Sequence, residues 1–98
     1  MNGGDNFIDA EIALKLTRDS FYNLRNSIIA SINSAIRTAC VQFLSEIHYN
    51  DDTLFKSDKN LLDSIVKYFR SRGFGVEVIP GRFFEESLLK IWWRVDYE

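Results

Sequence analysis

The chain has 98 residues, of which 46% are hydrophobic and 27% are charged. This size and composition are typical of one soluble domain with a single core, which is too small to enclose a large interior pocket. We therefore expect any ligand to bind in a surface cleft or between subunits. The net charge of −2 disfavours tight nonspecific binding to nucleic acid, which requires clustered Lys and Arg.

The cysteine, histidine and apolar content limit where the protein can be located in the cell and which chemistry it can perform. The only cysteine, Cys40, cannot form an internal disulfide, which favours a cytoplasmic location, and we expect it to be buried as a small apolar residue. No apolar run approaches the roughly 20 residues of a membrane span. His48 is the only histidine, and no second His or Cys lies at metal-ligand spacing. We expect no metal, no cofactor, no catalytic residue and no membrane partner.

The N-terminal half predicts one long helix. We expect residues 1–8 to be flexible and residues 9–98 to form a single α+β domain. Asp9 is a suitable N-cap. The alternative is a break into two helices at residues 17–20, but the absence of Pro and Gly there favours one continuous helix. Apolar residues recur there mostly every three or four positions, as on one side of an amphipathic helix. This stripe comprises Ile12, Leu16, Phe21, Leu24, Ile28, Ile32, Ala35 and Ala39.

The second half predicts a strand, a second helix and a hairpin. Alternating apolar residues predict a short strand within 42–49, and residues 50–53 are typical of a turn. Ser57 or Asp58 caps a second helix, and Gly73 ends it in a left-handed conformation. Its buried side carries Leu61, Leu62, Ile65, Val66 and Phe69.

The C-terminal segment predicts two strands, at 74–79 and 87–95, joined by a turn that begins at Pro80-Gly81. In the last strand, alternate residues share one face, so Trp92 lies on the side opposite to Leu89 and Ile91. The expected fold is α+β: a long N-terminal helix, a short strand, a second helix and a C-terminal β-hairpin. The three strands would form a small antiparallel sheet with both helices on one face.

The long helix also predicts self-association. Between residues 20 and 45 the only charged residues are Arg25 and Arg37, whereas a surface helix usually carries Lys and Glu. Small uncharged side chains let another backbone approach closely and lose little entropy on burial. We expect a homo-oligomer interface here; the alternative is an ordinary surface helix rich in Ser and Asn. The predicted interface residues are Leu24, Ile28, Ser31, Ile32 and Ala35.

The outer face of the last strand predicts a ligand site. An exposed Trp flanked by cations can stack on a base while the cations bind phosphate or carboxylate. Alternatively, the Trp packs under a neighbouring element and the cations are solvated. The candidate ligand residues are Arg82, Lys90, Trp92 and Arg94. Arg70 and Arg72 are explained more simply as cations at a helix C-terminus.

The order of elements between about residues 25 and 95 resembles small bacteriophage accessory proteins. The likeness rests on Arg72-Gly73-Phe74 at a helix end, followed by Gly75-Val76-Glu77-Val78 and, after a loop, Leu89-Lys90-Ile91-Trp92. A helix with Ile32, Ala35, Ile36 and Ala39 precedes them and leads into a strand. Such proteins often have a Gly at that junction, where this chain has Cys40-Val41. The resemblance implies a protein made early in infection that binds host factors or defence-signalling nucleotides; it transfers no functional residue.

Together these observations predict a non-enzymatic, homo-oligomeric phage protein that counters host defence by sequestering a nucleotide signal or a host protein. One alternative is a structural or assembly protein without a ligand. Another is a winged-helix DNA-binding regulator, in which a helix before a two-stranded wing reads DNA. The acidic balance and the lack of a third predicted helix count against the winged helix. Its reading helix would offer Lys59, Asn60, Lys67 and Arg70.

Overall fold

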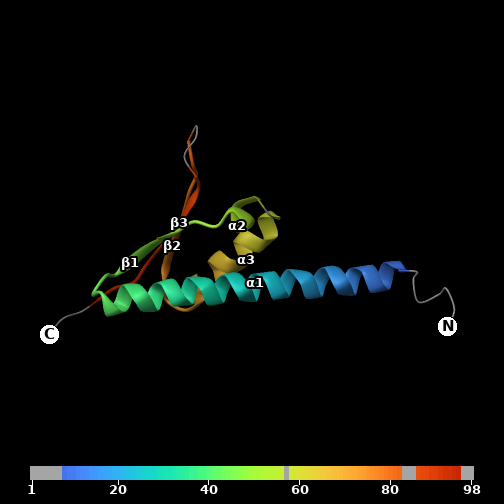
Figure 1. The fold of residues 1–98 in the computed structure, drawn as a ribbon, viewed down its shortest axis with the longest axis horizontal. Helices are drawn as coiled ribbons and strands as arrows, with labels where there is room; N and C mark the ends of the chain where they lie inside the picture. Colours follow the sequence, from blue (N-terminus) through green and yellow to red (C-terminus); the bar gives the residue numbers. More distant parts are fainter. Residues whose placement is uncertain (1–7, 57, 83–85, 96–98) are drawn as a thin grey trace.

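The computed structural model describes residues 8–56, 58–82 and 86–95, and these residues form the expected α+β fold (Figure 1). The predicted flexible segment 1–8 lies outside the described residues except for Ile8. A short helix that the sequence did not predict lies between the first strand and the second expected helix. The elements are α1 (Ala10–Val41), β1 (Glu46–Tyr49), α2 (Asp52–Lys56), α3 (Lys59–Ser71), β2 (Gly75–Ile79) and β3 (Leu88–Trp92).

The three strands form an antiparallel sheet in the order β1-β3-β2, so the last of the described strands occupies the centre. Ile91 of β3 lies opposite Ile47 of β1 and Val76 of β2. Leu89 and Ile91 are fully buried, as expected from the alternation of faces. The helices cover this face of the sheet, with α1 against β1 and α3 against β2. On the other face, which we call the open face, Glu77 and Trp92 are exposed.

The hydrophobic core lies between the two long helices and the sheet. Phe69 of α3 is fully buried, and its ring meets the Phe74 ring edge-on with centroids 5.8 Å apart. Asp58 caps α3 by accepting a hydrogen bond from the backbone N–H of Asn60 at 2.9 Å, as predicted. The largest fully buried side chains are Phe69, Ile32, Leu54, Leu61, Ile65, Leu89 and Ile91.

Helix α1 is continuous over 32 residues, a length of about 48 Å. It begins at the predicted cap, where Asp9 Oδ1 accepts from the N–H of Ile12 at 2.8 Å. Every residue from 10 to 20 is exposed, and this part of α1 projects beyond α3 (Figure 1). The prediction that Ile12 and Leu16 continue the buried stripe is wrong. The five-residue step from Leu16 to Phe21 turns the side chain by about 140° around the helix axis, so the two residues face away from the core.

Strand β1 lies within the predicted range 42–49 but begins only at Glu46, because a turn that closes α1 occupies the residues before it. The helix continues to Val41 and closes with two hydrogen bonds, from Phe43 N–H to Cys40 O at 3.1 Å and from Leu44 N–H to Ala39 O at 2.9 Å. Phe43 lies between them in the left-handed region, with φ 62°. This is the Schellman pattern, which favours Gly at that position. Cys40 is exposed in the last turn of α1, so the prediction that it is buried is wrong.

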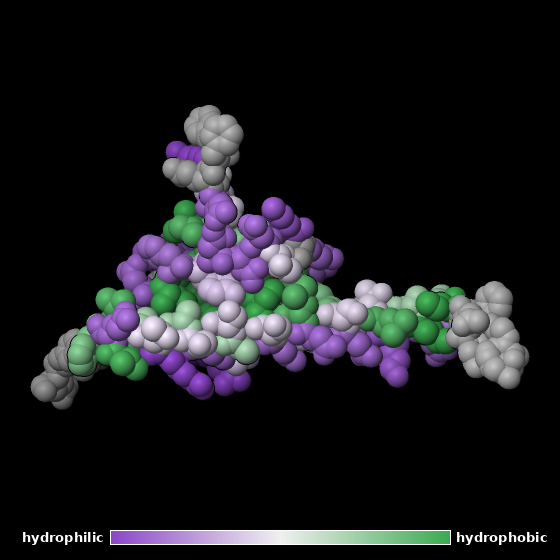
Figure 2. All heavy atoms as spheres, in the orientation of Figure 1, coloured by the Kyte–Doolittle hydropathy of each residue, from purple (hydrophilic) through white to green (hydrophobic). Residues whose placement is uncertain are grey.

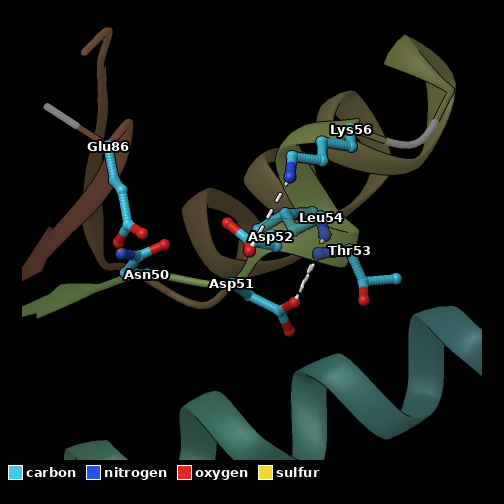
Figure 3. Close-up of polar contacts among 7 residues, drawn as sticks. All are labelled: Asn50, Asp51, Asp52, Thr53, Leu54, Lys56 and Glu86. Atoms are coloured by element: carbon cyan, nitrogen blue, oxygen red, sulfur yellow. Dashed lines mark hydrogen bonds and ion pairs between the residues drawn. The ribbon is translucent and has the colours of Figure 1, made fainter. Parts of the chain in front are cut away.

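Helix α2 forms where the sequence predicted only a turn. The carboxylate of Asp51 accepts hydrogen bonds from the backbone N–H groups of Thr53 at 2.9 Å and Leu54 at 3.4 Å (Figure 3). Leu54 is buried, so the turn that Asp51 caps brings an additional apolar residue into the core. The side-chain amide of Asn50 donates to Glu86, which joins the start of α2 to the β2–β3 hairpin.

Candidate functional site

Two of the predicted ligand residues lie side by side on the open face of the sheet. The ammonium of Lys90 is 5.4 Å from the centroid of the Trp92 ring, and the Trp92 residue is 39% exposed. The indole lies against Gly75 of the neighbouring strand, where a β-carbon would clash with it. The absence of a side chain at Gly75 therefore makes room for the indole.

The other two predicted ligand residues, Arg82 and Arg94, are exposed beyond the ends of the strands. From the register at the base of the hairpin, Arg82 lies on the order of 15 Å from Lys90. In addition, Lys90 stands in register between Glu77 and His48, and His48 contacts Glu46 at 2.9 Å. The carboxylates of Glu77 and Glu46 thus offset the positive charge on the open face of the sheet. The role of Arg82, Lys90, Trp92 and Arg94 in ligand binding stays a prediction.

The predicted interface residues divide between the core and the surface. Ile28 and Ile32 are buried within the chain itself, so a second copy could not reach them while the domain stays folded. Leu24 and Ala35 are partly buried. Ser31 is exposed on the sheet side of α1, where its hydroxyl lies 3.0 Å from that of Tyr49. Self-association stays a prediction, and Ile28 and Ile32 offer no surface for it.

A hydrogen bond between the hydroxyl groups of Tyr49 and Ser31, 3.0 Å apart, links β1 to α1. The Tyr49 hydroxyl also lies 3.2 Å from the carboxylate of Asp51. A phenol has one proton, so it can donate to the carboxylate while accepting from the serine. Partial burial raises the pKa of Tyr49 above 10, and the negative charge of Asp51 acts in the same direction. Ser31 lowers this pKa without cancelling the increase.

A cluster of cations lies instead in the groove between α1 and α3, where two arginines share one aromatic ring. The guanidinium carbon of Arg72 is 4.9 Å from the centroid of Tyr68, and that of Arg25 is 5.4 Å from it. Arg25 Nε also donates to Ser64 Oγ at 2.6 Å. These contacts position the guanidinium groups while leaving other N–H donors available to a ligand.

Open hollows lie on both sides of Tyr68. The larger, with a volume of about 540 Å³, is lined by Arg25, Asn60, Asp63, Ser64, Lys67, Tyr68 and Ser71. The smaller, about 270 Å³, is lined by Asn33, Ile36, Arg37, Tyr68, Phe69, Arg72 and Phe74.

We call the surface formed by Arg25, Arg37, Lys67, Tyr68 and Arg72 the arginine groove. Among the described residues it holds four cations, and Asp63 is the one carboxylate that lines either hollow. Within residues 8–56, 58–82 and 86–95, no carboxylate forms an ion pair with any of its three arginines. The groove is therefore electropositive although the chain as a whole is acidic.

Sequence reasoning did not identify this groove. Arg25 and Arg37 were noted only as the two charges on an otherwise uncharged helix, and Arg72 only as a cation at a helix end. The only sign of the groove in the sequence was a pair of isolated arginines twelve residues apart on one helix. The contact of Arg25 with Tyr68 depends on how α1 and α3 pack, which the local pattern does not specify.

Within the described parts of the chain, no group of three or more His, Cys, Asp and Glu side chains is arranged to hold a metal ion. Over the same residues, no helix combines the length and apolar character needed to cross a bilayer. We compared the chain with protein-family models, with curated proteins and with solved structures, and none of the three comparisons gave a match.

Proposed function

We propose that the chain is a binding protein that holds a phosphate-bearing ligand in the arginine groove without reacting with it. The observation that carries this proposal is the placement of Arg25 and Arg72 on one tyrosine ring with no carboxylate partner among the described residues. Surface arginines without a carboxylate partner remain available for an external anion.

Phosphate is the anion best matched to this arrangement. A guanidinium offers parallel N–H donors that fit two oxygens of one phosphate, and such charge-assisted bonds are roughly twice as strong as neutral ones. Tyr68 holds the Arg25 and Arg72 side chains in place, so less side-chain entropy is lost when a ligand binds. Lys67 adds a further cation on the same side as Arg25.

A nucleotide is the first ligand class that we propose. The volume of the larger hollow, about 540 Å³, lies within the range of roughly 300–1,000 Å³ that is typical of small-molecule sites. Asn60 and Ser71 line it and could bind the edge of a base or a sugar. Sequestering such a nucleotide in a host cytoplasm is the role that the resemblance to bacteriophage accessory proteins implies.

Duplex DNA is a second candidate, and helix α2 favours it. With α2 present, the elements follow the order helix, strand, two helices and a hairpin. Helix α2 is thus the third helix that the winged-helix interpretation lacked. Lys59, Asn60 and Lys67 are exposed on α3. Arg70 is less available for DNA because one of its guanidinium N–H groups donates to the carbonyl of Val76 at 2.8 Å.

Calorimetric titration of the chain with pyrophosphate, with a panel of mono- and cyclic dinucleotides, and with a short DNA duplex tests the proposal. We expect binding that Arg72→Ala weakens about tenfold or more, since a charged hydrogen bond contributes about 1.5–3 kcal/mol. Arg72→Lys keeps the charge but loses the paired donors, so it should restore affinity only in part.

Arg18→Ala is the matched control, because Arg18 is an exposed arginine of α1 outside the groove. It removes the same charge and should leave affinity unchanged. A steep loss of affinity with salt, restricted to the duplex, would favour DNA over a nucleotide. If no phosphate compound binds, or if the Arg18 and Arg72 variants weaken binding equally, the proposal is wrong.

A further inference from the structure

Helix α1 has a second exposed side that no described part of the chain covers. Its core side carries residues such as Ile28 and Ile32, and the opposite side is exposed along the full length of the helix. We call this opposite side the outer face of α1. Its exposed residues are Ile12, Leu16, Asp19, Asn23, Ser27, Ala30, Ser34, Arg37 and Val41. Arg37 stands at the edge of this face, where its side chain also lines the smaller hollow of the arginine groove.

The outer face is apolar at its two ends and carries small or polar side chains between them. Ile12 and Leu16 lie near the start of α1 and are 45% and 51% exposed. Val41 ends the helix at 79% exposure, and Leu44 follows it just after the turn. Figure 2 shows hydrophobic atoms on the projecting part of α1 and again at the opposite end of the molecule. Exposed apolar residues at both ends are surface that a partner could bury favourably.

Two opposite charges lie on this otherwise uncharged face. Asp19 and Arg37 are eighteen residues apart, which is about five whole turns, so both lie on one line along the helix. They are separated by about 27 Å along the axis and cannot pair within one chain. Neither forms an ion pair within the described residues.

We propose that a second copy of the chain docks antiparallel on the outer face of α1, about a two-fold axis near Ser27 and Ala30. Reversing the helix direction brings each Asp19 beside the partner's Arg37. This register brings Leu16 to within one residue of the partner's Val41, so the apolar ends bury one another. The small side chains at the centre allow the two helix axes to approach closely.

Self-complementarity identifies a second copy as the occupant rather than an unrelated protein. In a two-fold dimer the same patch of both subunits makes the contact, so the patch must be complementary to itself. The outer face meets this requirement, because it has apolar residues at each end and unlike charges at about equal distances from its centre. A parallel pair would instead set Asp19 opposite Asp19 and Arg37 opposite Arg37, and like charges repel. The charge pattern therefore selects the antiparallel arrangement.

Sedimentation velocity over protein concentrations from about 5 to 500 µM tests the dimer, since this range covers weak to moderately tight association. The native chain should shift from monomer to dimer as its concentration rises. Ala30→Glu places two carboxylates near the two-fold axis and should leave the chain monomeric. Asn60→Glu, at an exposed site on α3, adds the same charge away from the outer face and should dimerise normally.

Charge reversal then tests the register. Asp19→Arg and Arg37→Asp should each weaken the dimer at least severalfold, because each sets like charges together twice. The double variant should regain the native affinity, although its two changed residues are far apart within one chain. A chain that stays monomeric at every concentration, or a dimer that ignores Ala30→Glu or the single reversals, would overturn the proposal. Circular dichroism of each variant checks that the monomer is folded.

Discussion

The backbone N–H of Leu44 donates to the carbonyl of Ala39 at 2.9 Å and so closes the C-terminus of α1. Phe43 turns the chain between them with φ 62°. Phe43 is 85% exposed and contributes little to the core. Glycine occupies the equivalent position at the end of α3, where Gly73 has φ 92°. The same backbone turn is thus built once with the favoured residue and once with a bulky aromatic one.

Phe43→Gly should therefore stabilise the fold by about 1 kcal/mol, because a residue with a β-carbon is strained in the left-handed region and glycine is not. Urea denaturation followed by circular dichroism measures the change. Gly73→Ala, the reverse change at the other helix end, should destabilise by about 1–2 kcal/mol. All variants should be compared at one protein concentration, since dimer formation adds to stability. Equal or lower stability of Phe43→Gly would contradict the strain argument.

Gly75→Ala should displace the Trp92 indole, because the new methyl group would occupy the same space. The cost expected for overpacking of this kind is about 1–3 kcal/mol. Trp92 would become more solvent-exposed, so tryptophan fluorescence should shift to longer wavelength in the native state. Glu77→Ala, two residues along on the same open face, is the control and should leave the emission unchanged. A native-like spectrum for Gly75→Ala would mean that the indole does not rest on Gly75.

The raised pKa of Tyr49 predicts a loss of stability in alkali. Its folded-state pKa lies above the ordinary value of 10, so the unfolded chain gives up this proton first. The contribution is fully present below pH 10 and is lost as pH rises through the folded pKa. Tyr49→Phe should reduce the fall in stability between about pH 9 and pH 11. Chemical denaturation at each pH measures this slope.

Tyr22→Phe controls for the loss of a hydroxyl, because Tyr22 is an exposed tyrosine of α1. The proposed effect of Tyr49 is contradicted if stability falls with pH equally steeply in the native chain and in Tyr49→Phe. It also fails if Tyr22→Phe flattens the slope to the same extent.

Local signals in the sequence predicted those elements whose ends are marked by side chains. Asp9 and Asp58 cap helices as expected, and Gly73 ends α3 in the left-handed conformation. The alternation in β3 correctly assigned Leu89 and Lys90 to opposite faces. In each case the interaction that determines the structure joins residues only a few positions apart, so the local sequence pattern is enough to predict it.

The remaining features depend on contacts between distant segments or on unfavoured residues. The left-handed turn after α1 was missed because Phe43 stands where the rule expects glycine. Helix α2 was missed because the Asp51 cap was interpreted as part of a turn. The arginine groove joins residues that are 39 positions apart, as in the Arg25–Ser64 hydrogen bond, and no local pattern encodes that distance.

The central position of β3 has a consequence for biosynthesis. Strands β1 and β2 pair only with β3 and not with each other, and β3 begins at Leu88. A nascent chain that has emerged only as far as Gly81 holds all three helices of the described residues but lacks the strand that binds the outer two. Its apolar faces stay exposed until β3 has also emerged and can pair with the two outer strands.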